Sequence, residues 1–499
     1  MRTRPVLLLI LLLATSNSCD EKVNVLENCG DGVLDPGEEC DTGELNGETC
    51  ASLGHYDFLG QLGCKSSCTF DTTECGGKCG DGNIDVDHQE QCDGSNLSGN
   101  TCITLGYPGG VLACSAACVY DTSGCTGGCG DGNILAAAGE ECDGDNLRGR
   151  TCEDLGFWSG DIGCSATCRF DTGPCVRPVA LAAGFRHTCA LSSGGTVRCW
   201  GGNNAGQLGD GTTTAHLMPE PVPGLTDIVA ISGVYETNCA LAEDGRVWCW
   251  GAGYDNSPVL IMGGGFVSVS GGIQGCGIQG DGTVDCWNGF AYPDPVVPAT
   301  VAGLDGVVDL ASSHNVCAVL EDGSARCMGD NSSGQLGDGT STSSTVPVVV
   351  QNLAGAAGIQ TGTDFNCAWR TDGSVLCWGS NSYGQLGNDH VTGDPVVGLS
   401  DAISVHAEYV HACALTGSGA VRCWGYGGQG RLGDGAMQNR YTSVAVVGMT
   451  DAVSVVTGHQ HSCAIREDHS IWCWGFNGQG QLGNGATVDS AVPVEVMIP

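Results

Sequence analysis

The stretch CALAEDGRVWCWG, residues 239–251, decides the fold of this chain. Its centre is the Asp-Gly pair at 244–245, and glycine readily takes the left-handed conformation that closes a three-residue hairpin loop. Counting outward from this turn places Cys239 directly opposite Cys249, where side chains approach closely enough for a disulfide. Closing so short a loop stabilises a fold by roughly 2 to 3 kcal/mol in the chain-entropy model. The stretch therefore predicts a β-hairpin with its own disulfide.

Seven copies of this hairpin follow one another after residue 179. The first cysteines of successive copies lie 37 to 50 residues apart, which fits the four short strands of one propeller blade. We therefore predict an all-β fold in which residues 179–499 form a seven-bladed β-propeller. The predicted disulfides join Cys189 and Cys199, Cys239 and Cys249, Cys276 and Cys286, Cys317 and Cys327, Cys367 and Cys377, Cys413 and Cys423, and Cys463 and Cys473.

Zinc binding is the competing interpretation of these cysteine pairs. Nine residues separate the members of each pair across a hairpin, and this is not the spacing of a zinc knuckle. An exported chain also folds where disulfides persist. We therefore expect no metal in the propeller.

The stretch Pro-Val-Glu-Val at 493–496 matches the apolar strands that join the internal copies, but no further copy follows it. A closed propeller leaves no long sheet edge exposed. The sequence therefore predicts that this stretch completes the first blade.

The first 18 residues indicate export. Arg2 and Arg4 precede the apolar run 6–14, which is too short to span a bilayer and is followed by small and polar residues. We predict a signal peptide over residues 1–18 and a location at the cell surface or outer membrane, or in the medium.

Cys19 is the one cysteine of 33 that belongs to no repeat. It stands at the expected cleavage junction, in a stretch that resembles a lipoprotein signal except that Ser16 occupies a position where a Leu-like residue is usual. We predict lipid attachment at Cys19, with residues 19–28 as a tether and the lipid as the only contact with a membrane. Ordinary signal cleavage near Ser16 or Ser18 is the alternative.

Three blocks of six cysteines each occupy residues 29–75, 79–125 and 129–175. A block of this size cannot bury a sufficient core, so we expect three internal disulfides to replace it. Six cysteines allow 15 connectivities, and the spacing does not choose among them. The blocks resemble the cysteine-rich repeats of bacterial surface proteins. The three-residue connections between them, and the connection 176–178 to the propeller, predict a short semi-rigid stalk.

Acidic residues recur at the same places in the three blocks, in Gly-rich loops where oxygen atoms could hold calcium. Their spacing matches no established calcium loop, so a solvated acidic face with Asx-turns is the favoured alternative. The candidate ligands are Asp31, Glu38, Asp41, Asp81, Glu90, Asp93, Asp131, Glu140 and Asp143. We expect no other cofactor.

The chain has 18 Lys and Arg residues against 56 Asp and Glu residues, for a net charge of -38. Such a chain repels phosphate backbones and anionic headgroups, so we expect no nucleic-acid partner.

The motif Gly-Gln-Leu-Gly recurs at 206–209, 334–337, 384–387 and 480–483, after the Cys-Trp-Gly or Cys-Met-Gly that ends the hairpin. With His187-Thr188-Cys189, these phrases resemble the regulator of chromosome condensation repeat over residues 179–499. The resemblance implies a seven-bladed propeller used to bind proteins. One branch of that family exchanges nucleotide on a small GTPase, which an exported disulfide-bonded chain does not meet. A secreted propeller that inhibits β-lactamases is a closer analogue.

The sequence shows no nucleophile elbow, zinc-protease motif or phosphate loop, and we expect no enzymatic activity. His187, His411 and His461 share one repeat position, where a hydrogen-bonded strand residue is the favoured interpretation over a catalytic or metal cluster. We predict a monomeric surface protein whose propeller binds a protein or surface polymer. An extracellular enzyme, or an inhibitor of one, is the alternative.

Copies two and three lack the long Gly-Gln-Leu-Gly loop and have aromatic residues there instead. Shortened loops on adjacent blades predict a notch, and aromatic anchors in a recess are typical of binding hot spots. We predict a partner site at Tyr254, Asp255, Phe290 and Tyr292. Aromatic rings that merely fill the gap are the alternative.

Overall fold

The computed structural model describes residues 29–55, 61–105, 107, 109–126, 134, 140–271, 274–288, 298–388 and 394–498. They fall into two compact units, residues 1–146 with 165–169 and residues 147–164 with 170–499. The predicted signal peptide, the tether and Cys19 lie outside the described residues. No helix in the described part of the chain has the length and apolar character needed to cross a membrane.

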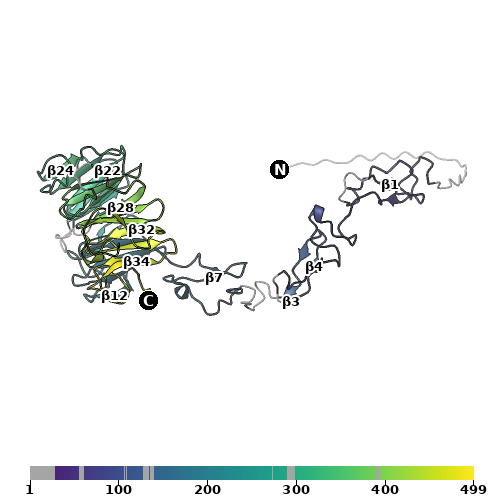
Figure 1. The fold of residues 1–499 in the computed structure, drawn as a ribbon, viewed down its shortest axis with the longest axis horizontal. Coiled ribbons are helices and arrows are strands. Elements are labelled where there is room, and N and C mark those ends of the chain that lie inside the picture. Colours follow the sequence, from purple (N-terminus) through teal and green to yellow (C-terminus); the bar gives the residue numbers. More distant parts are fainter. Residues whose placement is uncertain are drawn as a thin grey trace, which may run out of the picture. The chain divides into compact units, whose positions relative to one another are not determined.

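Seven antiparallel sheets form the propeller, which confirms the predicted fold (Figure 1). Blades 1 to 3 are β9 (Pro178–Ala183), β10 (His187–Ser192), β11 (Val197–Gly201) and β12 (His216–Pro221); β13 (Ile228–Val234), β14 (Thr237–Ala242), β15 (Val247–Gly251) and β16 (Val259–Met262); and β17 (Phe266–Gly271), β18 (Gln274–Gln279), β19 (Val284–Asn288) and β20 (Ala299–Thr300).

Blades 4 to 7 are β21 (Val307–Ser312), β22 (Asn315–Leu320), β23 (Ala325–Gly329) and β24 (Ser344–Val349); β25 (Ala356–Thr361), β26 (Phe365–Arg370) and β27 (Val375–Gly379); β28 (Ala402–Glu408), β29 (His411–Thr416), β30 (Val421–Gly425) and β31 (Arg440–Ala445); and β32 (Ala452–Thr457), β33 (His461–Arg466), β34 (Ile471–Gly475) and β35 (Ser490–Glu495). We name the strands of a blade A to D in chain order. Neighbouring A strands contact one another, and β9 contacts β32, so the A strands surround a central channel.

Each hairpin formed by strands B and C has the predicted register and disulfide. Cys239 pairs with Cys249 across β14 and β15, with their Cα atoms 4.1 Å apart, and Gly245 has a positive φ of 81°. The other six pairs are bonded in the same way. Thirteen of the fourteen cysteines are buried and Cys286 is partly buried, so the disulfides replace apolar side chains in the packing between blades.

In six of the seven blades, a tryptophan at the end of strand C donates a hydrogen bond to the blade before it. The Trp200 indole N–H donates to the carbonyl oxygen of Gln481 at 3.0 Å, which links blade 1 to the Gly-Gln-Leu-Gly loop of blade 7. Equivalent bonds join Trp250 to Gln207, Trp378 to Gln335, Trp424 to Gln385 and Trp474 to Arg431. The recurring loop is therefore a device for joining blades, since its backbone supplies the acceptor that each buried indole requires.

Two blades lack the Gly-Gln-Leu-Gly loop, and in each case the next blade differs at the tryptophan. Blade 2 lacks this loop, and the Trp287 indole of blade 3 donates instead to the Tyr254 hydroxyl at 3.1 Å. Blade 3 also lacks the loop, and blade 4 has Met328, which has no N–H to satisfy, at the tryptophan position. Where a blade lacks the loop, the next blade's tryptophan therefore has another acceptor or is replaced by a side chain that needs none.

The predicted role of the C-terminal stretch 493–496 is wrong. Strand β35 pairs with β34 as the outer strand of blade 7, with Cys473 opposite Val494. Blade 1 needs no strand from the C-terminus because β9 already supplies its inner strand. The ring closes instead through side chains packed between blade 7 and blade 1.

Trp158 of the third cysteine-rich repeat completes this closing contact, which we call the seam. It is 2% exposed and packs with Trp200, Leu482 and Val496. At the other junctions the valine equivalent to Val496 packs with a large aliphatic residue three positions later: Leu225, Leu353, Leu399 or Met449. In the seam, Trp158 is the large side chain that joins Val496.

Residues 147–164 and 170–175 of the third repeat consequently belong to the same compact unit as the propeller. The Trp158 N–H donates to the Val176 carbonyl at 2.8 Å, and the Ser193 N–H of the first hairpin turn donates to the Arg177 carbonyl at 2.7 Å. The connection 176–178, predicted to be semi-rigid, is thus bonded on both sides and leads directly into β9. Arg177 of this connection therefore lies beside the turn between strands B and C of blade 1.

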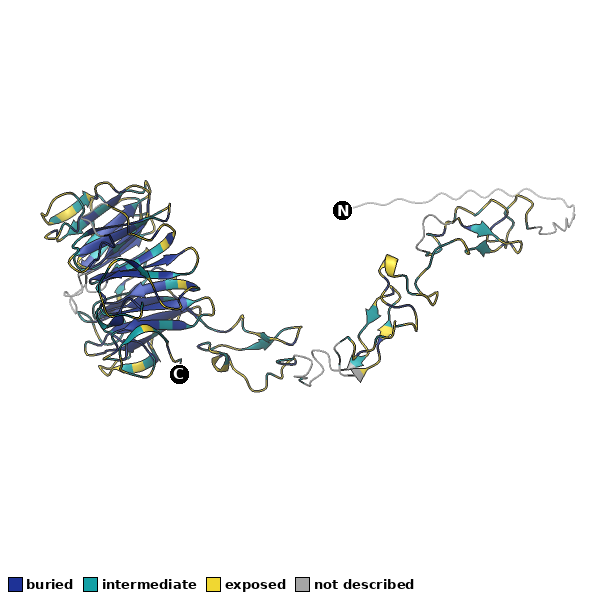
Figure 2. Cartoon of the chain, in the orientation of Figure 1, coloured by how far each residue is buried: buried dark blue, intermediate teal, exposed yellow. Residues whose placement is uncertain are grey.

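The cysteine-rich repeats are held by disulfides around very short strands, and Figure 2 shows far fewer buried residues in them than in the blades. Their connectivity is first to fifth, second to fourth and third to sixth cysteine, as in Cys29–Cys68, Cys40–Cys64 and Cys50–Cys75. The second repeat repeats this pattern, and Cys152–Cys175 matches it in the third. The regular elements are β1 (Gly63–Cys64), β2 (Phe70–Asp71), η1 (Val86–His88), β3 (Gly109–Gly110), β4 (Ala113–Cys114), β5 (Tyr120–Asp121), β6 (Cys125–Thr126), η3 (Glu153–Leu155), β7 (Gly163–Cys164) and β8 (Phe170–Asp171), with η5 (Gly428–Gly430) in the propeller.

Candidate functional site

The turns between strands A and B meet around one end of the central channel, which we call the channel mouth. Each turn is only two or three residues long because strand B begins directly after strand A. Phe185, Tyr235, Tyr409 and His459 stand four positions before the first cysteine of their blades, and His314 stands three positions before Cys317. The mouth therefore gathers aromatic side chains from blades 1, 2, 4, 6 and 7.

Ring contacts join these side chains into one cluster. Tyr409 stacks on His459 with ring centroids 3.4 Å apart, and Phe185 meets His459 edge-on at 4.2 Å. Tyr235 meets His314 edge-on at 5.2 Å, and its hydroxyl lies 2.8 Å from the His314 Nε2. Tyr235 at 6.1 Å from His459 connects the two groups. The cluster thus spans the mouth.

Backbone hydrogen bonds fix the turns that present these rings. The Phe185 N–H donates to the Tyr235 carbonyl at 2.5 Å, and the His459 N–H donates to the Gly184 carbonyl at 3.0 Å. Tyr235 and Tyr409 adopt left-handed φ angles of 55° and 51°, which are uncommon outside glycine. Such conformations persist where the surroundings over-determine them. The aromatic surface is therefore held rigidly before any ligand arrives.

Two arginines lie beside the aromatic cluster. Arg186 lies over the Phe185 ring at 4.8 Å, and Arg431 lies over the Tyr426 ring at 4.6 Å. The buried Arg431 guanidinium donates to the His459 carbonyl at 2.7 Å, and burial lowers its pKa to about 10. The mouth therefore combines aromatic side chains with both signs of charge, because Glu236 and Asp364 stand in the turns between strands A and B of blades 2 and 5.

The channel beneath the mouth is polar. A cavity of about 290 Å³ is lined by side chains that include Glu408, Asp309, His406 and Gln360. Burial raises the pKa of Glu408 to about 8 and also raises that of Asp309, whereas burial lowers the pKa of His406 to about 4. Burial therefore disfavours the charged form of each of these groups.

The three histidines that share a repeat position form hydrogen bonds between blades. The His187 Nε2 lies 2.9 Å from the Asn238 amide oxygen, the His411 Nε2 lies 3.0 Å from the Ser462 hydroxyl, and the His461 Nε2 lies 2.7 Å from the Thr188 hydroxyl. All three histidines are fully buried. A hydroxyl beside a histidine could serve a nucleophilic mechanism, but no substrate reaches these pairs, so their role is structural.

Acid is expected to unfold the propeller through these histidines. Burial lowers the pKa of His187 to about 4 and of His461 to about 3, and burial with nearby Arg431 holds that of His411 well below its ordinary value of 6.5. The unfolded chain binds these protons and the folded chain does not, so stability is fully present above pH 6.5 and is lost as the pH falls towards 4. Each histidine adds a slope of about 1.4 kcal/mol per pH unit.

Urea unfolding at pH 7, 6, 5 and 4.5 measures this slope. His461→Gln is expected to lower this slope by about 1.4 kcal/mol per pH unit, because one titrating group is removed. It is also expected to lower the free energy of unfolding at pH 7. A free energy of unfolding that does not change between pH 7 and pH 4.5 would contradict the assignment.

The structure describes two of the four residues of the predicted partner site, and these two have different surroundings. Tyr254 is partly buried against the core of blade 2, and its hydroxyl accepts the Trp287 hydrogen bond. Asp255 is exposed, and its carboxylate accepts the Asn256 N–H at 2.8 Å. Phe290 and Tyr292 lie outside the described residues. These contacts support the alternative in which Tyr254 fills the gap, and the partner role of this site stays a prediction.

Six of the candidate calcium ligands accept hydrogen bonds from N–H groups of their own repeats. Burial opposes ionisation of Asp41, but hydrogen bonds from the backbone and hydroxyl of Thr42 and from the N–H groups of Gly32 and Gly30 outweigh it and lower the pKa to about 2. Asp93 accepts three N–H groups in the second repeat in the same way. Glu38 and Glu90 accept the N–H groups of Asp35 and Asp85.

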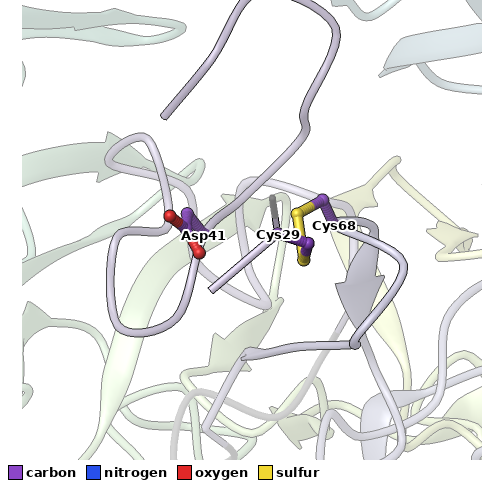
Figure 3. Close-up of side chains that lie close together, drawn as sticks. All are labelled: Cys29, Asp41 and Cys68. Atoms are coloured by element: carbon purple, nitrogen blue, oxygen red, sulfur yellow. A yellow bond between two sulfur atoms is a disulfide. The ribbon is translucent and has the colours of Figure 1, made fainter. Parts of the chain in front are cut away.

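Figure 3 shows Asp41 beside Cys29 and Cys68, whose sulfur atoms are bonded to each other and so are not free to bind a metal. Asp31 and Asp81 accept hydrogen bonds from residues two positions later, which is the Asx-turn pattern. Glu140 and Asp143 lie together in the third repeat, and Asp131 lies outside the described residues. The contacts therefore support the Asx-turn alternative over calcium.

Two family models of the Regulator of chromosome condensation (RCC1) repeat match the propeller. One matches residues 179–207, 228–257, 357–385 and 452–481, and the other matches residues 194–241, 322–369, 372–414 and 468–499. The chain is 28% identical over 229 residues to the E3 ubiquitin-protein ligase HERC2 of Homo sapiens, and as similar to that of Mus musculus. The match covers 38% of this chain and 5% of each ligase, so it concerns a small part of those proteins.

Solved structures show the same fold. The propeller is similar to yeast RCC1 (Prp20) bound to Kap60, with a TM-score of 0.54 and 18% identity over 64% of this chain and 85% of that chain. It is also similar to Prp20p from Saccharomyces cerevisiae, a protein described for its binding to Gsp1p and histones, with a TM-score of 0.52 and 18% identity over 64% of this chain and 87% of the other. At this identity, the likeness concerns the fold alone.

Proposed function

Because residues 179–499 form a seven-bladed propeller in which models of the Regulator of chromosome condensation (RCC1) repeat match residues 179–257, 322–414 and 452–499, we propose that this chain is an extracellular binding protein and that its partner docks on the channel mouth. The observation that supports this proposal is the rigid cluster of Phe185, Tyr235, His314, Tyr409 and His459. Preorganised aromatic side chains with adjacent arginines are the usual anchors of protein interfaces, since little entropy is lost when they bind. We propose no enzymatic activity.

The connection 176–178 supports the same choice of surface. Its Arg177 carbonyl accepts the Ser193 N–H in the turn that connects strands B and C of blade 1. Turns between strands A and B lie at the opposite end of every blade because successive strands run antiparallel. The channel mouth therefore lies at the end away from the connection 176–178 through which the chain enters the propeller.

The disulfides support a location outside the cell. Each blade has one buried disulfide, and the cysteine-rich repeats add several more. Cytosolic reductants do not permit such a set in most organisms. We propose that the chain is exported by the sequence 1–18 and held at the surface through a lipid on Cys19, or released if cleavage occurs near Ser16 or Ser18.

The binding face is tested by substitutions at the channel mouth. The double variant Phe185→Ala with His314→Ala is expected to lose at least about tenfold of its partner affinity, because two anchors of an aromatic hot spot are removed. The full chain is immobilised and exposed to cell-envelope and secreted fractions, and captured proteins are measured by quantitative mass spectrometry.

Tyr441→Ala is the matched control, since Tyr441 is 44% exposed but lies on the outer strand β31 and not at the mouth. It should capture the same proteins as the unmodified chain. Equal capture by the double variant, with an unchanged melting temperature, would place the binding surface elsewhere on the molecule.

A further inference from the structure

The end of the propeller away from the channel mouth, which we call the base, consists of the turns between strands B and C and the beginnings of the A strands. Each turn is bonded to the beginning of strand A in its own blade. The Glu243 N–H donates to the Asp227 carbonyl at 2.9 Å, and the Glu321 N–H donates to the Gly306 carbonyl at 3.0 Å. The same bond recurs in the other five blades. The base therefore repeats one arrangement seven times around the central channel.

The second residue of every A strand lies in a β-bulge. In blade 2, Ile228 pairs with Ala242 and Ala230 pairs with Leu241, so Val229 has no partner in strand B. The registers of the other six blades skip the equivalent residue in the same way. A bulge turns the side chain of its extra residue away from the direction that the regular strand would give it. Val229 is accordingly exposed, although Ile228 before it is buried.

Six of the seven bulged residues are β-branched aliphatic residues, and the seventh is Ala357, which is also exposed. The six side chains are 47% to 62% exposed, and they belong to Val179, Val229, Val267, Val308, Ile403 and Val453. Neighbouring A strands contact one another around the channel, so these equivalent positions form an apolar ring, which we call the base ring. Single exposed apolar residues are ordinary, but apolar side chains gathered on one surface are typical of an interaction site.

The turns beside the base ring are acidic. They contain one arginine, Arg246, which is paired with Asp244 at 2.6 Å, and His469, whose pKa is lowered chiefly by burial. The eight acidic residues of the turns are Glu243, Asp244, Asp281, Glu321, Asp322, Asp372, Glu467 and Asp468.

Hydrogen bonds keep several of these carboxylates charged. The hydroxyl and the N–H of the residue two positions later lower the pKa of Asp281, Asp322 and Asp372. The base therefore has an apolar centre and a negatively charged rim. An apolar core inside a polar rim is the usual arrangement of a protein interface.

Charge determines which partner fits this surface. A second copy of the chain would bring the same acidic turns against these, and like charges across an interface are unfavourable. The first two cysteine-rich repeats are acidic as well, with 16 Asp and Glu residues against two lysines in residues 29–125. A partner that has lysines or arginines around exposed apolar side chains complements both the base ring and the turns.

We propose that the base is a second docking surface, which binds a partner protein that presents apolar side chains within a basic surface. The base ring would supply the desolvated centre of the contact, and the acidic turns would orient the partner and speed its association. The base lies at the opposite end of the channel from the mouth. This proposal does not rest on the proposed function, so either one can fail without the other.

The probe is an acetylated and amidated peptide that repeats Lys-Leu-Leu-Lys three times, titrated calorimetrically against the full exported chain at low ionic strength. A matched peptide has serine in place of every leucine. We expect saturable binding of the leucine peptide, at least about tenfold tighter than that of the serine peptide, because only the former buries the base ring. Added salt should weaken the binding. Hydrogen exchange should slow in residues 265–267, 280–283, 305–308 and 321–324.

The test variant is Val267→Ser with Val308→Ser, in neighbouring blades that do not adjoin blade 1, beside which Arg177 lies. It should lose at least about tenfold of its affinity for the leucine peptide while its melting temperature stays unchanged, because both side chains are exposed. The matched control is Val346→Ser with Val492→Ser, two exposed valines of the outer strands β24 and β35. The control should bind the leucine peptide as tightly as the unmodified chain does.

Three results would overturn the proposal: equal affinity for the two peptides, undiminished binding by the test variant, or slowed exchange confined to other segments. Light scattering that shows a dimer of the unmodified chain but not of the test variant would assign the base to a second copy and also overturn it. Flotation of the unmodified chain, but not of the test variant, with phosphatidylcholine vesicles would assign the base ring to a lipid surface, with the same consequence.

Discussion

Trp158→Ala is expected to lower the free energy of unfolding of the whole propeller by about 3 to 5 kcal/mol, although Trp158 belongs to a cysteine-rich repeat. The side chain is 2% exposed and fills the seam with Trp200, Leu482 and Val496. Its loss leaves a cavity between blades 7 and 1, at the one junction that has no covalent continuity between its blades. Trp158→Phe should cost less, because most of the apolar volume remains.

Urea unfolding followed by far-ultraviolet circular dichroism measures this effect. Ile103→Ala is the control, because Ile103 is 69% exposed in the second cysteine-rich repeat and its truncation should change nothing. If Trp158→Ala melted the third repeat while the β signal of the propeller kept its unmodified midpoint, the repeat would be an appendage and the seam would not need it.

Deleting residues 490–499 is expected to prevent the propeller from folding to a protease-resistant state. The deletion removes β35, exposes the edge of β34 and takes Val496, which is 4% exposed, out of the seam. The lost burial and strand pairing amount to at least about 5 kcal/mol, a large part of the stability of an ordinary domain.

Limited proteolysis and calorimetry of the exported chain provide the measurement. Val492→Ala is the control, since Val492 lies in the same strand but is 38% exposed. The expected digestion pattern of the deleted chain covers all seven blades, because an open ring loses the packing of blade 1 as well as that of blade 7. Cleavage confined to blade 7, with blades 1 to 6 intact, would show that the ring tolerates opening.

The hairpins were predictable because their physics is local. A turn at Asp-Gly fixes the register, the register sets Cys239 opposite Cys249, and seven such units at blade-like spacing require a propeller. The closure was not predictable in this way. It depends on Val496 meeting a side chain more than 300 positions earlier in the chain, and no period in the sequence connects Trp158 with that position.

The aromatic cluster at the channel mouth was not predicted, although the sequence contains a pattern that indicates it. Phe185, Tyr235, Tyr409 and His459 occupy one repeat position, four residues before the first cysteine, and a comparison of the seven copies column by column would have gathered them. The predicted partner site was placed instead at the shortened loops of copies two and three. At Tyr254 the irregular residue repairs a hydrogen bond between blades, so irregularity there reflects packing more directly than binding.

The indole bonds between blades also bear on how such chains diversify. A blade that lacks the loop leaves the indole of the next blade without its usual acceptor. Here blade 2 supplies the Tyr254 hydroxyl as a substitute, and blade 4 has Met328 in place of the tryptophan. The residues that must change together in such a chain therefore lie at the contact between two blades and not within one blade. A chimera cut in the middle of each sheet should fold more readily than one assembled from whole blades.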